Sequence, residues 1–313
     1  MSCRHRFALL LATLVLVLAL PARAQPAAAC GAELQQPRPA IAHTLAALAQ
    51  HEHAQMGGAL IDAGGGLIRS GFAEAERGRL PGAALPAWQR VWRYWHAVPD
   101  FYDQHMAWMD ALAPTALQRV TLVDQPWSAA FISWLMREAG LRRQQFAFSA
   151  SHHDYVRAAI DAAQAERDGS GTAYGWRACD LAQTPPRLGD LLCFARGQDA
   201  SLDRFDALRA AVAQGPVSMH CELVVSQRAR QIQTMGGNVL DTVVLRELDL
   251  QQDGSGLLWP AYLQATQRQQ QRALVEQPPP GQAQSLWPRT HLSEQPWSML
   301  LQLRAAAWRP PHR

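Results

Sequence analysis

Three polar residues at the ends of predicted elements have the chemistry of a nucleophilic hydrolase. Ser128 stands at the start of a predicted helix, His220 opens the segment HCELVV, and Asn238 closes the segment MGGNV. A hydroxyl nucleophile needs an imidazole to accept its proton, and the imidazole needs a third group to hold its tautomer. His220 and Asn238 are separated by one predicted hairpin, so antiparallel pairing would bring them together. The alternative interpretation is that Ser128 only caps its helix.

The helix that positions Ser128 is predicted within Asp124–Gly140. Pro126 sets its entry, and Gly140 is placed to end it as a left-handed cap. Its sides are apolar almost all round, which is typical of a buried central helix. Free backbone N–H groups and the positive end of the helix dipole at Ser128 favour an oxyanion there, with the Gln125 side chain as a further candidate donor.

Several other kinds of site are excluded or disfavoured by the sequence. It contains no lysine, which excludes Schiff-base chemistry, Ser–Lys hydrolases and a P-loop nucleotide site. It has no CxxC or HExxH spacing, and His51 and His53 are two residues apart, which puts them on different sides of a helix. We therefore expect no metal and no cofactor.

The N-terminus has the pattern of an export signal. Arg4 and Arg6 precede the apolar run Phe7–Leu20, and Ala22-Arg23-Ala24 offers small residues for cleavage before Gln25. A lipoprotein signal ending at Cys30 is the less favoured alternative. Residues 1–24 hold three arginines and no acid, so the net charge falls from +3 to zero on cleavage. We expect a periplasmic or secreted protein without a transmembrane segment in the mature chain, and charge gives no argument for nucleic acid.

The remaining chain predicts an α+β fold with helices first and an antiparallel sheet second. After the signal we expect a helical region over 25–115, a core over 116–250 and a C-terminal extension over 251–313. The first region contains a helix at Ile41–Met56, a loop at Gly64–Gly66, and a tryptophan stripe that ends at Pro99. The expected strands are Asp190–Ala195, Val217–Ser226, Gln231–Asn238 and Thr242–Leu248.

Two further segments complete this prediction. Ser151 and Asp154 form a capping box for a helix over Asp154–Glu166, which leaves His152 and His153 solvated in its first turn. In the extension, Gln264–Gln271 and Pro278–Gly281 indicate a surface excursion, after which Trp297–Leu303 returns as a final strand.

Four segments of this chain resemble a known group of enzymes. PWSAAFISW is similar to the PWCAAFV-type segment of CHAP and NlpC-type peptidoglycan hydrolases, in which the third residue is the cysteine nucleophile. GDLLCF, HCELVV and MGGNV resemble the strands of the same fold, the last two supplying the histidine and its orienting partner. Taken together over Leu122–Leu248, the four segments most resemble the bacterial domain-of-unknown-function family numbered 2272.

The resemblance implies a papain-like fold in which Ser128 takes the place of the cysteine nucleophile. A serine hydroxyl is essentially never ionised and depends entirely on its base. Two functions remain open. One is a cell-wall (peptidoglycan) amidase or peptidase with the arrangement Ser128, His220 and Asn238. The other is an inactive module that binds cell-wall peptide or a protein partner.

The four cysteines left after cleavage favour disulfides, since an oxidising compartment and an even count argue for pairing. Cys193 and Cys221 lie in strands that are neighbours in the resembled fold, which implies that these two pair. Cys30 and Cys179 would then form the second pair and tie the N-terminal segment to the core.

Overall fold

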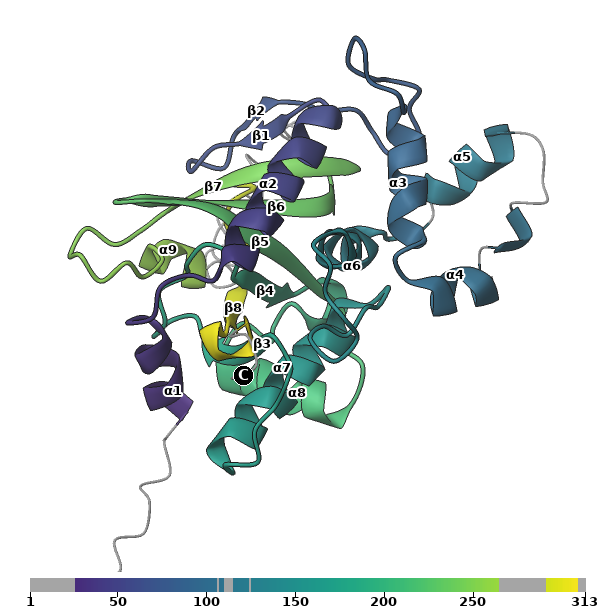
Figure 1. Cartoon of the computed structure of the whole chain (residues 1–313). Helices are drawn as coiled ribbons and strands as arrows, with labels where there is room; N and C mark the ends of the chain where they lie inside the picture. The colour runs from purple at the N-terminus through teal and green to yellow at the C-terminus, as the bar shows by residue number, and fades with distance from the viewer. Residues whose placement is uncertain (1–25, 106, 110–114, 124, 265–290, 309–313) are drawn as a thin grey trace, which may run out of the picture.

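The computed structural model describes residues 26–105, 107–109, 115–123, 125–264 and 291–308, which form one eight-stranded sheet with nine α-helices. The helices are α1 Pro26–Glu33, α2 Ala40–Gln55, α3 Ala87–Trp95, α4 Pro99–His105, α5 Thr115–Val123, α6 Ser128–Glu138, α7 His152–Arg167, α8 Phe205–Gln214 and α9 Pro260–Leu263 (Figure 1). The strands are β1 Ala59–Ile61, β2 Leu67–Arg69, β3 Trp176–Asp180, β4 Leu191–Ala195, β5 Met219–Arg228, β6 Gln231–Val239, β7 Thr242–Asp249 and β8 Trp297–Leu303. The predicted α+β class is confirmed.

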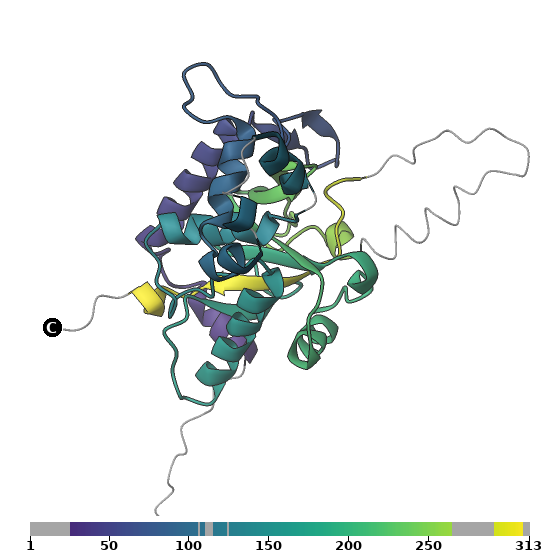
Figure 2. The same cartoon turned by 90° about the vertical axis from the view of Figure 1, so that its right-hand side faces the viewer.

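The sheet has the strand order β2-β1-β7-β6-β5-β4-β8-β3. All neighbours from β7 to β3 are antiparallel, and only β1 pairs with β7 in parallel. The expectation of a purely antiparallel sheet is therefore wrong at this edge. The predicted final strand is confirmed as β8, which enters the sheet between β4 and β3 (Figure 2). The rest of the predicted excursion, from 265 to 290, lies outside the described residues.

Strand residues alternate between two apolar layers, as the two-residue period of a strand requires. Leu191, Cys193 and Leu223 belong to the core beneath the helices, while Leu192 and Val224 belong to a second core on the other side of the sheet. Both faces of the central strands are thus buried. This explains why their sequences are apolar runs rather than alternating patterns.

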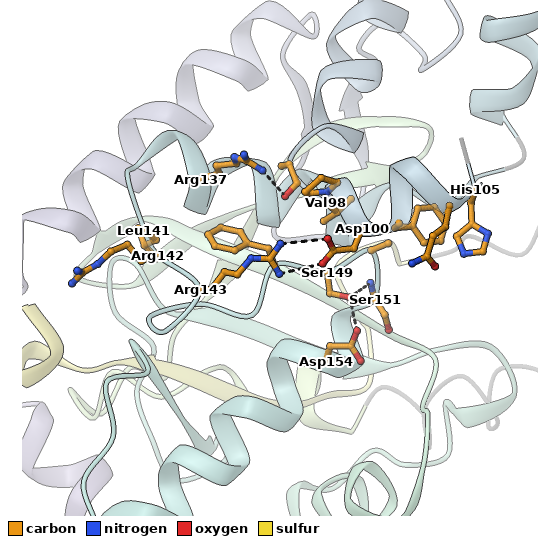
Figure 3. Close-up of a pocket in the computed structure, with 16 residues that line it drawn as sticks. Val98, Asp100, His105, Arg137, Leu141, Arg142, Arg143, Ser149, Ser151 and Asp154 are labelled. Atoms are coloured by element: carbon orange, nitrogen blue, oxygen red, sulfur yellow. Dashed lines mark hydrogen bonds and ion pairs between the residues drawn. The ribbon is translucent and has the colours of Figure 1, made fainter. Parts of the chain in front are cut away.

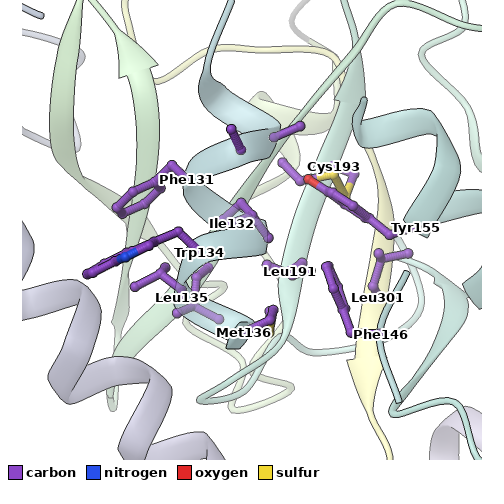
Figure 4. Packing of buried hydrophobic residues seen from close by; sticks show 14 of the residues in the cluster. Phe131, Ile132, Trp134, Leu135, Met136, Phe146, Tyr155, Leu191, Cys193 and Leu301 are labelled. Atoms are coloured by element: carbon purple, nitrogen blue, oxygen red, sulfur yellow. A yellow bond between two sulfur atoms is a disulfide. The ribbon is translucent and has the colours of Figure 1, made fainter. Parts of the chain in front are cut away.

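Helix α6 has the predicted position and the predicted burial. Every residue from Ser128 to Met136 is buried, and the helix packs on β5 and β6 and against α2 and α3. Figure 4 shows its side chains between the sheet and α7, with Ile132 and Met136 turned toward Phe146 and Tyr155. Gly140 has a φ of 81°, the left-handed conformation expected of the residue that ends this helix.

The N-terminal region is helical apart from one hairpin that the sequence pattern missed. The predicted helix at Ile41–Met56 corresponds to α2, but residues 59–69 form β1 and β2 and extend the sheet. Each of these strands has three residues, too few to display a period. In α3 the tryptophan stripe is largely core, since Trp88 and Trp95 are buried. Pro99 begins α4 rather than merely ending α3.

Both predicted disulfides are confirmed. Cys193 and Cys221 are cross-strand neighbours of β4 and β5, with Cα atoms 4.1 Å apart. Cys30 joins α1 to β3 through Cys179 over 149 residues of sequence. No helix in the described part of the chain has the length and apolar character needed to cross a membrane.

The two disulfides should differ in their contribution to stability. The chain-entropy model gives about 5 kcal/mol for the Cys30 to Cys179 loop and about 3.5 kcal/mol for the loop between Cys193 and Cys221, because the first closes 149 residues and the second 28. Urea unfolding of the two double alanine variants should therefore show the larger loss for Cys30→Ala with Cys179→Ala. Equal losses, or the reverse order, would contradict this entropic account.

Candidate functional site

Ser128 is the first residue of α6, and its hydroxyl is bonded to a histidine of another helix. Ser128 Oγ lies 2.7 Å from Nε2 of His152, the first residue of α7. Only 3% of Ser128 and 4% of His152 are exposed. The imidazole that contacts the candidate nucleophile in this structure is therefore His152.

The expectation that His152 is solvated is wrong. Helix α7 begins at His152 rather than Asp154, and Ser151 makes no side-chain capping bond. Instead, Ser149 Oγ donates to Asp154. This earlier start turns His152 inward, against Ser128 and Tyr155. Burial and the neighbouring His220 lower its pKa well below 6.5, so the His152 ring is neutral near neutral pH.

The hydrogen bond at Nδ1 of His152 determines which ring nitrogen carries the proton. Nδ1 is bonded to the hydroxyl of Tyr155, which is fully buried and whose pKa is raised by that burial, so the phenol keeps its proton. Among the described residues, His152 Nδ1 is the only acceptor for that proton. Because a buried donor without an acceptor costs about 1–3 kcal/mol, we assign the phenol as donor to Nδ1. A neutral ring then carries its proton on Nε2 and donates to Ser128 Oγ.

His220 lies beside His152 and belongs to a buried ionic cluster. The two imidazole rings are 5.1 Å apart between centroids. His220 Nε2 lies 3.5 Å from Glu222 Oε1, on the same strand two residues further on. Glu222 in turn accepts hydrogen bonds from Arg246 and from Thr234 Oγ1. His220 is thus placed beside a fixed carboxylate.

Glu222 remains ionised despite being fully buried. Burial alone would raise its pKa, but the charge of Arg246, together with contacts to His220 and Arg246, lowers the pKa to about 2. Arg246 is itself held by a bond to the backbone oxygen of Leu292 in the C-terminal segment. The ionised carboxylate therefore places a negative charge beside the His220 ring.

Asn238 lies next to the start of α6 and contacts groups other than His220. With its amide oriented to suit its neighbours, the Asn238 side-chain oxygen accepts from the backbone N–H of Trp127. The side-chain nitrogen donates to Glu74, and each distance is 3.2 Å. The Trp127 indole also donates to Glu74, at 2.5 Å. Asn238 has a left-handed φ of 55°, which asparagine tolerates better than most residues. Its described contacts position the helix start, and its predicted role in orienting His220 stays a prediction.

The two glycines of MGGNV allow β6 to approach the site closely. A Cβ at Gly236 would lie 2.9 Å from His220 Nε2, and one at Gly237 would lie 2.6 Å from Phe131 Cβ on α6. Neither position tolerates a side chain without movement of these groups.

Gln125, the predicted oxyanion donor, is half-buried, and its backbone N–H donates to the backbone oxygen of Leu122.

Sequence reasoning missed four participants of this site: His152, Tyr155, Glu222 and Arg246. Glu222 had a usable signal, because a residue two positions after His220 on a strand shares its side. His152 had none, since a histidine at a helix start is usually solvent-exposed.

His53 is buried and bonded to the Ala59 backbone oxygen at 2.8 Å. The described residues contain no group of three or more side chains suited to hold a metal.

Comparisons with known proteins give one family match. The model of the family described as "Uncharacterized protein conserved in bacteria (DUF2272)" matches residues 83–301, which include Ser128, His152, His220, Glu222 and Asn238 but not Glu74. No curated protein and no solved structure gives a significant match to the chain.

The neutral, buried state of His152 predicts a dependence of stability on pH. Because its folded-state pKa is below 6.5, the unfolded chain takes up a proton first as the pH falls. The free energy of unfolding should therefore decrease below pH 6.5, by at most about 1.4 kcal/mol per pH unit for this group. Urea unfolding between about pH 7.5 and 5.0 should give a shallower slope for His152→Gln. The control His43→Gln, at an exposed position of α2, should keep the wild-type slope; an unchanged slope in His152→Gln would contradict the assignment.

Proposed function

The chain belongs to the DUF2272 family of uncharacterized bacterial proteins, and we propose that this member hydrolyses amide bonds of cell-wall peptide. Ser128 is the proposed nucleophile and His220 its base. One observation carries the proposal. The Ser128 hydroxyl lies at the N-terminus of a buried helix and is bonded, at 2.7 Å, to an imidazole with a second imidazole beside it.

The proposed fold is papain-like, of the kind found in CHAP and NlpC-type peptidoglycan hydrolases. What supports it is a buried helix that begins at the nucleophile position and packs on antiparallel strands that supply a histidine. The order of the four segments along the chain points the same way. The hairpin β1–β2 and strand β8 would be additions to that core.

In the proposed reaction, Ser128 Oγ attacks the amide carbonyl carbon and its proton passes to His220. The negative charge on the carbonyl oxygen would be stabilised by backbone N–H groups at the start of α6. Protonated His220 then gives this proton to the leaving amine, and a water repeats the cycle on the resulting ester. Glu222, paired with Arg246, stabilises His220 while it is charged.

His152 has a different part in this proposal. Its Nε2–H points at Ser128 Oγ, so this nitrogen cannot accept the serine proton. It can orient the hydroxyl and stabilise negative charge as it develops on Oγ. The base must then be the other imidazole. The donor role of His152 and the resemblance to cysteine hydrolases both support His220 as the proposed base.

A periplasmic or secreted location fits this function. Two disulfides join cysteines that would remain reduced in most cytoplasms. The sequence of residues 1–24 has the pattern of a cleaved signal peptide. Peptidoglycan would be encountered in the compartment that this signal reaches.

A second candidate function is supported by the burial of the site. Ser128, His152 and His220 are exposed by only 3–5%, so a peptide cannot reach the hydroxyl without movement of the surrounding chain. An inactive papain-like module that binds cell-wall peptide or a protein partner would need no such access. The two functions differ in whether Ser128 matters for peptide turnover.

Turnover of peptidoglycan fragments by single variants tests the proposed function. Ser128→Ala should abolish the release of new amine groups, and His220→Gln should reduce the rate by about 10²–10⁴-fold, as expected for loss of a general base. His152→Gln should retain more activity than His220→Gln, because a glutamine amide still offers an N–H to Oγ. Half-buried His153 follows directly in the same helix, so His153→Gln serves as a matched control that should be near wild type.

The outcomes of this assay separate three interpretations. A larger loss in His152→Gln than in His220→Gln, with Ser128→Ala inactive, would assign the base to His152. Activity that survives Ser128→Ala would exclude Ser128 as the nucleophile. No turnover by the wild type over the whole set of fragments would favour the binding module.

An engineered thiol reports on the site without a substrate. At the positive end of α6 and beside two imidazoles, Ser128→Cys should have a pKa below the usual value of about 8.5. Alkylation by iodoacetamide in denaturant-free buffer, compared between mildly acidic and alkaline pH so that the burial of the site affects both rates alike, should therefore persist to lower pH than for an unperturbed thiol. Adding His220→Gln should slow the reaction more than adding His153→Gln does. The same pH dependence of alkylation as for an unperturbed thiol would indicate that Ser128 is only a helix cap.

A further inference from the structure

A cavity of about 740 Å³ lies between α4 and the segment that follows α6. Its size is within the range of small-molecule and peptide sites. One wall is formed by the start of α4, another by the end of α6 and residues 141–143, and a third by Phe148–Asp154 (Figure 3). The third wall runs directly into α7, the helix that begins with His152.

An ion pair spans this cavity. Arg143 lies 3.1 Å from Asp100, and the two side chains come from opposite walls, as Figure 3 shows. Their side chains are 67% and 74% exposed. An exposed pair of this kind contributes little to folding. It therefore opens at little cost and leaves one cationic and one anionic group for a ligand.

The rest of the lining adds apolar surface and further polar groups. Arg137 on α6 lies within hydrogen-bond reach only of the backbone oxygens of His96 and Ala97, each at 3.4 Å, so its charge is not neutralised by an acid among the described residues. Asp154 accepts from Ser149 Oγ. The apolar part of the lining is Val98, Phe101, Leu141 and Phe148.

We propose that this cavity binds a short peptide that presents an ammonium and a carboxylate group. The ligand carboxylate would replace Asp100 on Arg143, a geometry that guanidinium groups favour. The ligand ammonium would take the place of Arg143 on Asp100. A ligand with both charges satisfies both partners, whereas a purely anionic or cationic ligand leaves one of them without its counter-charge. The apolar lining accommodates small aliphatic side chains.

As a substrate subsite, and resting there on the proposed function, the cavity would hold the free end of a cell-wall peptide. Ser149, Ser151 and Asp154 line the cavity, while His152 in the same segment points inward to Ser128. A peptide bound in the cavity would thus contact the same backbone segment that carries His152. Binding itself depends only on the cavity.

The experiment is calorimetric titration of the full mature protein carrying Ser128→Ala, which prevents turnover by the proposed nucleophile. The probes are the zwitterionic dipeptide Ala-Ala and its uncharged counterpart, N-acetyl-Ala-Ala-amide. Ala-Ala should bind and the capped peptide should not. Arg143→Gln and Asp100→Asn should each weaken Ala-Ala binding about tenfold or more, since each removes one charge-assisted contact. The combined exchange Arg143→Asp with Asp100→Arg should restore part of the binding lost in the single variants.

The matched control is Arg157→Gln, which breaks another exposed arginine–aspartate pair, that of Arg157 with Asp161 on α7. This pair does not line the cavity, and its loss should leave the affinity unchanged. Equal binding of the capped peptide, no binding of Ala-Ala, or equal weakening by the control would each overturn the inference. Binding without any peptidoglycan turnover by the wild type would preserve the inference while rejecting the hydrolase.

Discussion

The burial of α6 on every side is the constraint on which the site depends. A helix start leaves backbone N–H groups without intrahelical partners, and in an apolar environment each needs one from elsewhere. Here one backbone N–H, that of Trp127, donates to Asn238 on β6, and the side-chain hydroxyl of Ser128 is bonded to His152 on α7. Ser133 in the next turn is bonded to Ser149. The hydrogen bonds needed by the polar groups of this one buried helix therefore bring β6, α7 and the loop before α7 together around Ser128.

A second constraint is the ionised carboxylate inside the sheet. An unpaired buried charge is strongly destabilising, so Glu222 on β5 requires Thr234 on the adjacent strand β6 and Arg246 on β7, the strand beyond it. Arg246 in turn is bonded to the Leu292 backbone, which leads into β8. The C-terminal extension thereby helps to hold the carboxylate beside His220. This gives a physical reason why the family match extends beyond β7 to residue 301.

The sequence predicted those features that depend on local pattern. The bounds of α6 and β8 and the antiparallel strands from β4 to β7 followed from periodicity and turn residues, and the cysteine pairs followed from the resemblance. The hairpin at 59–69 and β3 were missed, because a three-residue strand has no period and β3 reads as an isolated segment after a glycine-rich loop. His152 was misplaced because α7 begins two residues earlier than the capping pattern indicated, and the starting residue decides whether the first side chain faces solvent or core. Such a rotation is a tertiary effect that no local pattern contains.

A serine at the start of α6 makes different demands on its surroundings from those a cysteine would make. A thiolate needs mainly a positive environment, which a helix N-terminus provides by itself. A serine hydroxyl needs an acceptor for its proton at the moment of attack. In this chain, the imidazole bonded to Ser128 is committed as a donor by Tyr155, because the buried phenol has no other described acceptor. If Ser128 acts as the proposed nucleophile, its reactivity would depend on a movement that brings His220 and the hydroxyl together, and Glu222 would be the charged partner of His220 when that ring accepts the proton.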